Sequence, residues 1–324
     1  MEETIITDSS LSNSTYEYVD YGGASEHTCF IVPELKAIAA VCIAVSLCGL
    51  VGNGLVLWFL GCSMKRNRFT LYTESLAVTD LCMLLLWFLL MLAVLSFSVI
   101  CLNGLISFYV QFVYEVVLLS QYLVLTSLCF LAAMSMEQSL AVFFPAWCHC
   151  HRPKHCSGIV FCMILALNGL FSVTPYLSST GERAYPGVAI AICTILSSLM
   201  LVSSLALFIK LRCGSQRQYP RKLHVAVLIS MLLFFVFGIP FTVEDFLYLP
   251  HSYALFPEMT SLTPFLLASL NSSIRPVLYF LLGSCRQRRS QCSLKVALQR
   301  VFAEGVRSEE RRQEPGDAVE ESIV

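Results

Sequence analysis

The chain has 324 residues, of which 56% are hydrophobic and 13% charged, and its formal net charge is −1. Its mean hydropathy is +0.71. These values exclude a soluble globular protein of this size and indicate one integral membrane domain. Membrane lipids, and not nucleic acid, are its expected surroundings.

Residues 1–33 are expected to form an extracellular N-terminal segment. Met1 is followed by acidic and polar residues rather than by a basic and then an apolar run, so no cleavable signal peptide is predicted. The first span must then direct insertion itself. Asn13 begins an Asn-Ser-Thr sequon for N-glycosylation. A triplet this short also arises by chance, so an unused sequon is the alternative.

Seven apolar stretches fill residues 34–284, which we take as one membrane domain. A spanning helix needs about 20 mostly apolar residues, because backbone amides in hydrocarbon can be satisfied only within the helix. The stretches lie near 35–60, 71–97, 107–133, 158–177, 188–211, 224–249 and 256–282. The sequence therefore predicts an all-α membrane protein, a seven-transmembrane helix bundle.

Basic residues are unevenly distributed between the connecting segments, and this predicts the orientation of the bundle. Lys and Arg in short loops stay on the cytoplasmic side. The segments after the first, third, fifth and seventh spans carry Lys65, Arg66, Arg68, Arg152, Lys154, Lys210, Arg212, Arg217, Arg221, Lys222, Arg286, Arg288 and Arg289. The opposite segments hold only Lys36 and Arg183. We predict a multi-pass protein of the plasma membrane with an extracellular N-terminus.

The cysteine pattern leaves one candidate disulfide. Most of the 15 cysteines lie within the predicted spans or on the inner side, where they behave as small apolar groups. Only Cys29 and Cys101 are expected on the oxidising side. A disulfide between them would tie the N-terminal segment to the top of the second span or the loop after it. Two free thiols are the alternative.

Three groups of residues resemble the Mas-related family of G-protein-coupled receptors. The first is VGNGLVLWFL at 51–60 with KRN at 65–67, which is similar to the family's first span and inner loop. The second comprises Leu140, Phe144, Pro145, Trp147 and CHRPK at 150–154, and the third comprises NSS at 271–273, Pro276, Tyr279 and SLKV at 293–296. The resemblance covers about 45–303 and implies a cell-surface receptor that couples an extracellular ligand to heterotrimeric G proteins.

Two ionisable residues lie deep in predicted spans, where charge is costly and usually functional. They are Asp80 in the second span and Arg275 in the seventh. By the resemblance, Asp80 corresponds to the carboxylate of an internal sodium site, with Asn53, Ser127, Asn271 and Ser272 as neighbours. The family has asparagine where this chain has Arg275. Because arginine keeps its proton, we expect an ion pair with Asp80 that takes the place of sodium. A lone carboxyl kept protonated by desolvation is the alternative.

The inner end of the third span departs from the family, because Glu-Arg-Cys is replaced by Glu137-Gln138-Ser139. The resemblance assigns that arginine to G-protein contact, and Gln138 lacks its charge and its planar fork. The resemblance also places Glu137, Pro145, Gly238, Pro240, Pro276 and Tyr279 at the activation and G-protein interface. The sequence is therefore consistent with a signalling receptor or with a decoy-like receptor that binds ligand with weak or no coupling.

Carboxylates near the outer ends of spans are the candidate ligand-binding residues. Glu115 lies near the outer end of the third span, and Glu244 with Asp245 lies about one turn beyond Pro240. Ser120 and Gln121 are expected to line the same cavity as Glu115. With the acidic N-terminal segment, these residues favour a cationic peptide or amine ligand. Helix-end carboxylates wetted by bulk water are the alternative.

The C-terminal part is expected on the inner side. Cys285 and Cys292 flank a basic run, a setting suited to palmitoylation in a short amphipathic eighth helix at 285–303. The composition of 304–324 predicts a disordered cytoplasmic tail. Its last residues, Ser322, Ile323 and Val324, match a ligand for a PDZ-domain protein, although so short a match also arises by chance.

Other functional classes fit the sequence less well. It contains no phosphate-binding glycine loop and no nucleophile with a positioned base, so neither an enzyme nor a cofactor is expected. His149, His151 and His155 lie beside cysteines in an inner loop that resembles the family's, and we do not expect them to bind metal. A transporter or channel usually has repeated halves, and no such repeat is visible.

Overall fold

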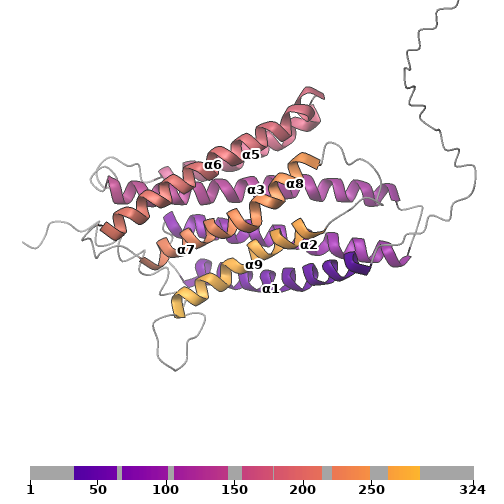
Figure 1. Cartoon of the computed structure of the whole chain (residues 1–324), viewed down its shortest axis with the longest axis horizontal. Coiled ribbons are helices and arrows are strands. Elements are labelled where there is room, and N and C mark those ends of the chain that lie inside the picture. Colours follow the sequence, from indigo (N-terminus) through magenta and orange to yellow (C-terminus); the bar gives the residue numbers. More distant parts are fainter. Residues whose placement is uncertain are drawn as a thin grey trace, which may run out of the picture.

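A computed structural model describes residues 33–63, 68–100, 106–144, 155–177, 179–213, 221–248 and 262–284. Helices account for nearly all of this described part, and they lie side by side in one elongated bundle (Figure 1). They are α1 (Pro33–Ser63), α2 (Arg68–Ile100), α3 (Ile106–Phe143), α5 (Cys156–Leu177), α6 (Ser179–Cys213), α7 (Arg221–Leu233), the π-helix η2 (Phe234–Gly238), α8 (Ile239–Tyr248) and α9 (Thr263–Ser284).

The predicted seven-transmembrane bundle is confirmed, because 7 helices are long and apolar enough to cross a membrane. The third span runs over Ser107–Phe143, well beyond its predicted end at 133. Its sequence contains no proline or glycine that would end the helix before Pro145. The amphipathic helix predicted for 285–303, the N-terminal segment 1–33 apart from the start of α1, and the tail 304–324 lie outside the described residues.

Helix α3 is the centre of the bundle. It packs against α2, α5 and α6 and also touches α7 and α8. Helix α1 lies at one edge on α2 and α9, while α5 and α6 form the other edge (Figure 1). Within the most apolar window of each span, 78% of α3 is buried but only 11% of α5. Helix α3 therefore meets other helices on most sides, whereas α5 presents most of its surface outward.

The outward surface of α5 and α6 is apolar. The exposed large side chains there include Ile159, Met163, Leu167, Leu170, Leu177, Ile195, Val202 and Leu205. In water, such a continuous apolar surface would mark an interface or an aggregation hazard. In hydrocarbon it needs no partner, because lipid tails are as apolar as leucine. The exposed surface therefore agrees with a helix pair that faces lipid.

The sixth span consists of α7, η2 and α8 in continuous succession. The backbone N–H of Ile239 donates to the carbonyl of Phe234, five residues earlier, and Pro240 follows with no N–H to donate. A Cβ atom on Gly238 would lie only 2.7 and 2.9 Å from the Phe234 ring. The phenylalanine thus fills the space that a side chain at Gly238 would need.

A close seam joins α1 to α9. The Ser273 hydroxyl donates to the Val45 carbonyl at 3.1 Å. A Cβ atom on Gly49 would meet the Ser273 side chain and would lie 2.7 Å from Leu84 Cδ1, and one on Gly52 would lie 3.1 Å from Pro276 Cβ. The two helices approach this closely because glycines face the seam.

This seam predicts different effects for two alanine substitutions in α1. Gly49→Ala should lower the melting temperature of the purified protein, because overpacking a tight contact costs about 1–3 kcal/mol. Gly54→Ala is the matched control, since a Cβ atom there has nothing within 4 Å. Thermal unfolding in detergent measures both variants. Equal melting temperatures for the two would contradict the seam.

Candidate functional site

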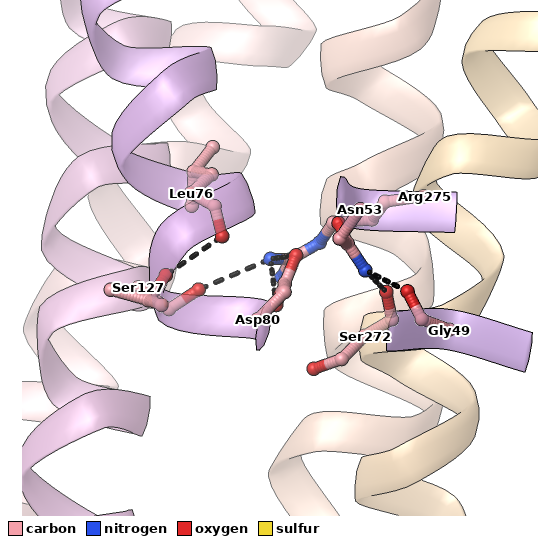
Figure 2. Close-up of polar contacts among 8 residues, drawn as sticks. Gly49, Asn53, Leu76, Asp80, Ser127, Ser272 and Arg275 are labelled. Carbon is pink, nitrogen blue, oxygen red and sulfur yellow. Dashed lines mark hydrogen bonds and ion pairs between the residues drawn. The ribbon is translucent and has the colours of Figure 1, made fainter. Parts of the chain in front are cut away.

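A buried ion pair lies at the centre of the bundle, where α2, α3 and α9 meet. Arg275 Nη1 donates to both carboxylate oxygens of Asp80, at 2.8 Å each. The same nitrogen donates to Ser127 Oγ at 3.2 Å. Figure 2 shows the guanidinium reaching from α9 between Asp80 on α2 and Ser127 on α3. One nitrogen atom thus links three helices.

The pair is removed from solvent. The exposed fraction of the side chain is 1% for Arg275 and 4% for Asp80. Both residues lie inside helices long enough to span a membrane, so neither charge can reach bulk water by a small movement. Desolvating two charges is expensive, and their mutual attraction offsets this cost only with good geometry and further hydrogen bonds. The hydrogen bond from Arg275 to the Ser127 hydroxyl is one of these further hydrogen bonds.

Polar side chains on α1 and α9 extend the ion pair into a network. Asn53 Nδ2 donates to the carbonyl of Gly49 at 3.0 Å and to that of Ser272 at 3.1 Å (Figure 2). Ser272 lies in the same helix as Arg275, three residues before it. Asn53 therefore ties α1 to the segment of α9 that carries Arg275. The network spans four of the seven spans.

Arg275 uses only one edge of its guanidinium in this arrangement. In the described part of the chain, neither Nε nor Nη2 has a hydrogen-bond partner. Asn271, one helical turn outward on α9, is buried, and its Oδ1 atom accepts no hydrogen bond from the described residues. Of the predicted polar core, Asn53, Asp80, Ser127, Ser272 and Arg275 are therefore connected by contacts, and Asn271 lies beside them on α9 without one.

A second polar cluster lies near the C-terminal end of α3, which is the inner end in the predicted orientation. Glu137 Oε1 accepts hydrogen bonds from the Tyr72 hydroxyl on α2 and the Ser157 hydroxyl on α5, both at 2.9 Å. Ser139 Oγ donates to the Ser203 carbonyl on α6 at 3.0 Å. The exposed fraction of Gln138 is only 1%. Hydroxyls, rather than an arginine, therefore hold the Glu137 carboxylate, and Gln138 points into the bundle.

The remaining residues of the predicted inner interface occupy separate places. Tyr279 is buried on α9. Pro276 packs against Gly52, and Gly238 is covered by Phe234 as described above. Pro240 lies at the start of α8. Pro145 is outside the described residues.

The structure separates the residues that were expected to share an outer cavity. Ser120 and Gln121 are fully buried, and the Ser120 hydroxyl donates to the Val117 carbonyl at 2.7 Å. Glu115 is exposed instead. Five residues of helix correspond to a rotation of about 140° around the axis, so Glu115 and Ser120 lie on different faces. The expectation that Glu115 lines one cavity with Ser120 and Gln121 overlooked this rotation.

The other predicted sites cannot be placed. Glu244 and Asp245 belong to α8, but their side chains are outside the described ones. The glycosylation residue Asn13, the cysteines Cys29, Cys101, Cys285 and Cys292, and the terminal residues Ser322, Ile323 and Val324 also lie outside the described part of the chain.

The sequence did not single out two participants of the inner cluster. Tyr72 lies eight residues before Asp80 on α2, and Ser157 is the second residue of α5. The sequence did indicate that the Glu137 carboxylate, if buried, would need hydrogen-bond donors. The sequence does not specify which helices supply these donors, because that depends on how α2 and α5 pack on α3.

Comparison with known proteins gives one group of relatives. No protein-family model matches this sequence. The chain is 33% identical over 307 residues to Mas-related G-protein coupled receptor member X1 of Homo sapiens, covering 91% of each chain. It is 32% identical over 294 residues to Proto-oncogene Mas of Rattus norvegicus, covering 87% of this chain and 88% of the relative. It is 35% identical over 274 residues to Mas-related G-protein coupled receptor member X2 of Homo sapiens, covering 80% of each.

Charge removal at the ion pair tests its coupling. Arg275→Asn and Asp80→Asn should each reduce surface expression and thermal stability strongly, because breaking a buried pair costs about 3–5 kcal/mol. The double variant should lose much less than the sum of the two, since no charge is left unpaired. Expression and melting temperature are measured for all three. An Arg275→Asn variant that folds and traffics like the parent, without coupling to Asp80, would show that the pair contributes nothing.

Proposed function

Because the chain belongs to the Mas-related family of G-protein-coupled receptors, we propose that it transduces an extracellular ligand to heterotrimeric G proteins. The protein is a multi-pass protein of the plasma membrane, and its relatives are receptors rather than enzymes. The observation that carries the proposal is the polar network that joins α1, α2, α3 and α9 at mid-bundle. Such a network can couple a conformational change at one end of the bundle to a conformational change at the other end.

The orientation that we propose places the N-terminus outside. Its support is the distribution of Lys and Arg described above, which stay in the cytoplasmic loops of membrane proteins. The sites for ligand and G protein then lie at opposite ends of the bundle. A ligand acts by binding one arrangement of the helices more tightly than another. The π-helix η2 and Pro240 interrupt the regular hydrogen bonding of the sixth span, so that span can adjust between arrangements.

The ligand that we propose is a cationic peptide or amine. Acidic residues outnumber Lys and Arg in the proposed outer segments, with Glu2, Glu3, Asp8, Glu17, Asp20, Glu26, Glu34, Glu182 and Glu258 against Lys36 and Arg183. Like-signed charge around an entrance raises the local concentration of oppositely charged ligands. Glu244 and Asp245 at the outer end of the sixth span are the carboxylates proposed to pair with the ligand.

We further propose that Arg275 takes the place of a bound sodium ion. Its Nη1 atom is surrounded by three oxygens, two from Asp80 and one from Ser127, at distances of 2.8 to 3.2 Å. A cation already attached to the protein neutralises the carboxylate at every salt concentration. The stability of this receptor should therefore not depend on sodium.

A decoy-like receptor is the second candidate, and the inner end of α3 favours it. Gln138 is buried and carries no charge, and the Glu137 beside it is held by Tyr72 and Ser157. Without a cationic side chain at position 138, one charged contact with the G protein is missing. The retained Pro240, Pro276 and Tyr279, with the basic residues of the proposed inner loops, favour the signalling reading.

The Gln138→Arg variant distinguishes the two readings. It should increase ligand-dependent G-protein dissociation by several-fold across a panel of cationic peptides, because it restores the missing charge. Gln138→Met is the matched control, since it changes the side chain without adding charge. Surface expression is measured for each variant, and signals are compared at equal expression. Identical dissociation for Gln138→Arg and the parent would mean that another contact replaces the charge and would remove the basis of the decoy reading.

The sodium proposal predicts that sodium stabilises the Arg275→Asn variant although it does not stabilise the parent. The purified parent should melt at the same temperature in sodium chloride and in choline chloride of equal ionic strength. Arg275→Asn frees Asp80 and Ser127, so sodium should raise its melting temperature by binding the folded state only. The added Asp80→Asn substitution should abolish that gain. A parent receptor that sodium stabilises over choline would contradict the proposal.

A further inference from the structure

The outer end of α3 carries a charged residue on a face that is otherwise apolar. Phe108, Gln111, Glu115 and Leu119 follow one another at spacings of three and four residues, so they form one stripe along the helix. All four are exposed, Phe108 to 75% and Leu119 to 46%. Glu115 is the only ionisable acid or base in the outer half of α3. Its carboxylate thus lies on the outward surface of the bundle.

The depth of Glu115 can be estimated from the ion pair. Asp80 is close to the middle of the span Phe69–Ser96, and Arg275 links it to Ser127 on α3. Ser127 follows Glu115 by twelve residues, which correspond to about 18 Å of helix. Half of the hydrocarbon core is about 15 Å. Glu115 therefore lies at the depth of the lipid headgroups.

A glutamine and two tyrosines lie near this carboxylate. Gln111 Nε2 donates to Glu115 Oε1 at 2.7 Å, which orients the carboxylate. Tyr114 directly precedes Glu115 on α3, and Tyr176 comes from the outer end of α5. The rings of Tyr114 and Tyr176 form an edge-to-face pair with centroids 6.3 Å apart. Tyr176 remains 55% exposed.

The surface below this cluster is apolar. Leu170 and Val173 on α5 are exposed to 67% and 47%. Leu119 on α3 lies one turn inward of Glu115. These side chains form the lipid-facing surface at the outer ends of α3 and α5, which pack against each other. A molecule with a cationic head and apolar tails matches the order of these groups.

We propose that Glu115, Tyr114 and Tyr176 bind the quaternary ammonium group of a phosphatidylcholine molecule, with its acyl chains lying along Leu119, Leu170 and Val173. A trimethylammonium group has no N–H to donate, so proteins recognise it by aromatic rings and negative charge. Glu115 and the two tyrosine rings supply both. Phosphatidylglycerol, which is anionic, is repelled by the carboxylate. The site belongs to the outer leaflet, an assignment that depends on the proposed orientation.

A soluble peptide can carry a cationic group as well, but the position of Glu115 favours a lipid. Ser120 and Gln121, which face the interior, are on another side of α3. Glu115 instead shares its face with Phe108 and Leu119, which have apolar surroundings in a membrane. A lipid headgroup is already present there at high local concentration. Glu115 is thereby assigned to the lipid-facing surface rather than to the ligand cavity.

Native mass spectrometry of the purified full-length receptor tests the site. Phosphatidylcholine and phosphatidylglycerol with identical acyl chains are added to separate samples in detergent. The parent should retain phosphatidylcholine preferentially, and Glu115→Gln should weaken this retention by about three- to ten-fold. Tyr176→Leu should weaken it as well, whereas Tyr176→Phe, which keeps the ring, should bind like the parent.

Glu34→Gln is the matched control, because Glu34 is another exposed carboxylate, in the first turn of α1. It should leave phosphatidylcholine retention unchanged. Equal retention of both lipids by the parent, or parent-like retention by Glu115→Gln, would overturn the proposal. So would an arginine-containing soluble peptide that requires Glu115 for binding while phosphatidylcholine shows no such requirement. None of these measurements involves a G protein or the receptor's own ligand, so they stand apart from the signalling proposal.

Discussion

The structure depends on the neutralisation of one buried carboxylate. Asp80 lies near the middle of a membrane span, where an unpaired charge is not tolerated. Arg275 supplies the opposite charge from α9, and its Nη1 atom also contacts Ser127 on α3. Because one nitrogen atom satisfies groups on two other helices, the positions of three helices become linked. The arrangement at the centre of the bundle follows from this single requirement.

The surrounding packing is adapted to hold the pair. Asn53 fixes the α9 backbone at Ser272, three residues before Arg275. This geometry requires α1 and α9 to be close, and Gly49 and Gly52 permit the approach. An ion tethered to the chain differs from a dissolved one in its mechanical effect. It neutralises the charge and at the same time ties α9 to α2.

The two ends of the bundle use different chemistry. At the inner end, neutral hydroxyls hold Glu137, and Gln138 points inward, so this part of α3 is closely attached to α2, α5 and α6. Near the other end of α3, Glu115 is exposed on the outside of the bundle, and Tyr114 beside it in sequence pairs with Tyr176. The chain thus has the helix arrangement of a receptor with an unusual charge at its centre, Arg275, and an uncharged Gln138 near one end of α3.

The sequence by itself determined the seven spans, because a run of about 20 apolar residues has few stable states other than a membrane helix. It also determined that Arg275 needs an acidic partner, since arginine keeps its charge, and it indicated Asp80 as that partner. Tertiary structure alone decided which donors hold Glu137 and that Glu115 is exposed while Ser120 is buried. These features depend on the rotation and packing of one helix against another, and apolarity along the chain does not encode them when lipid and protein surfaces are equally apolar.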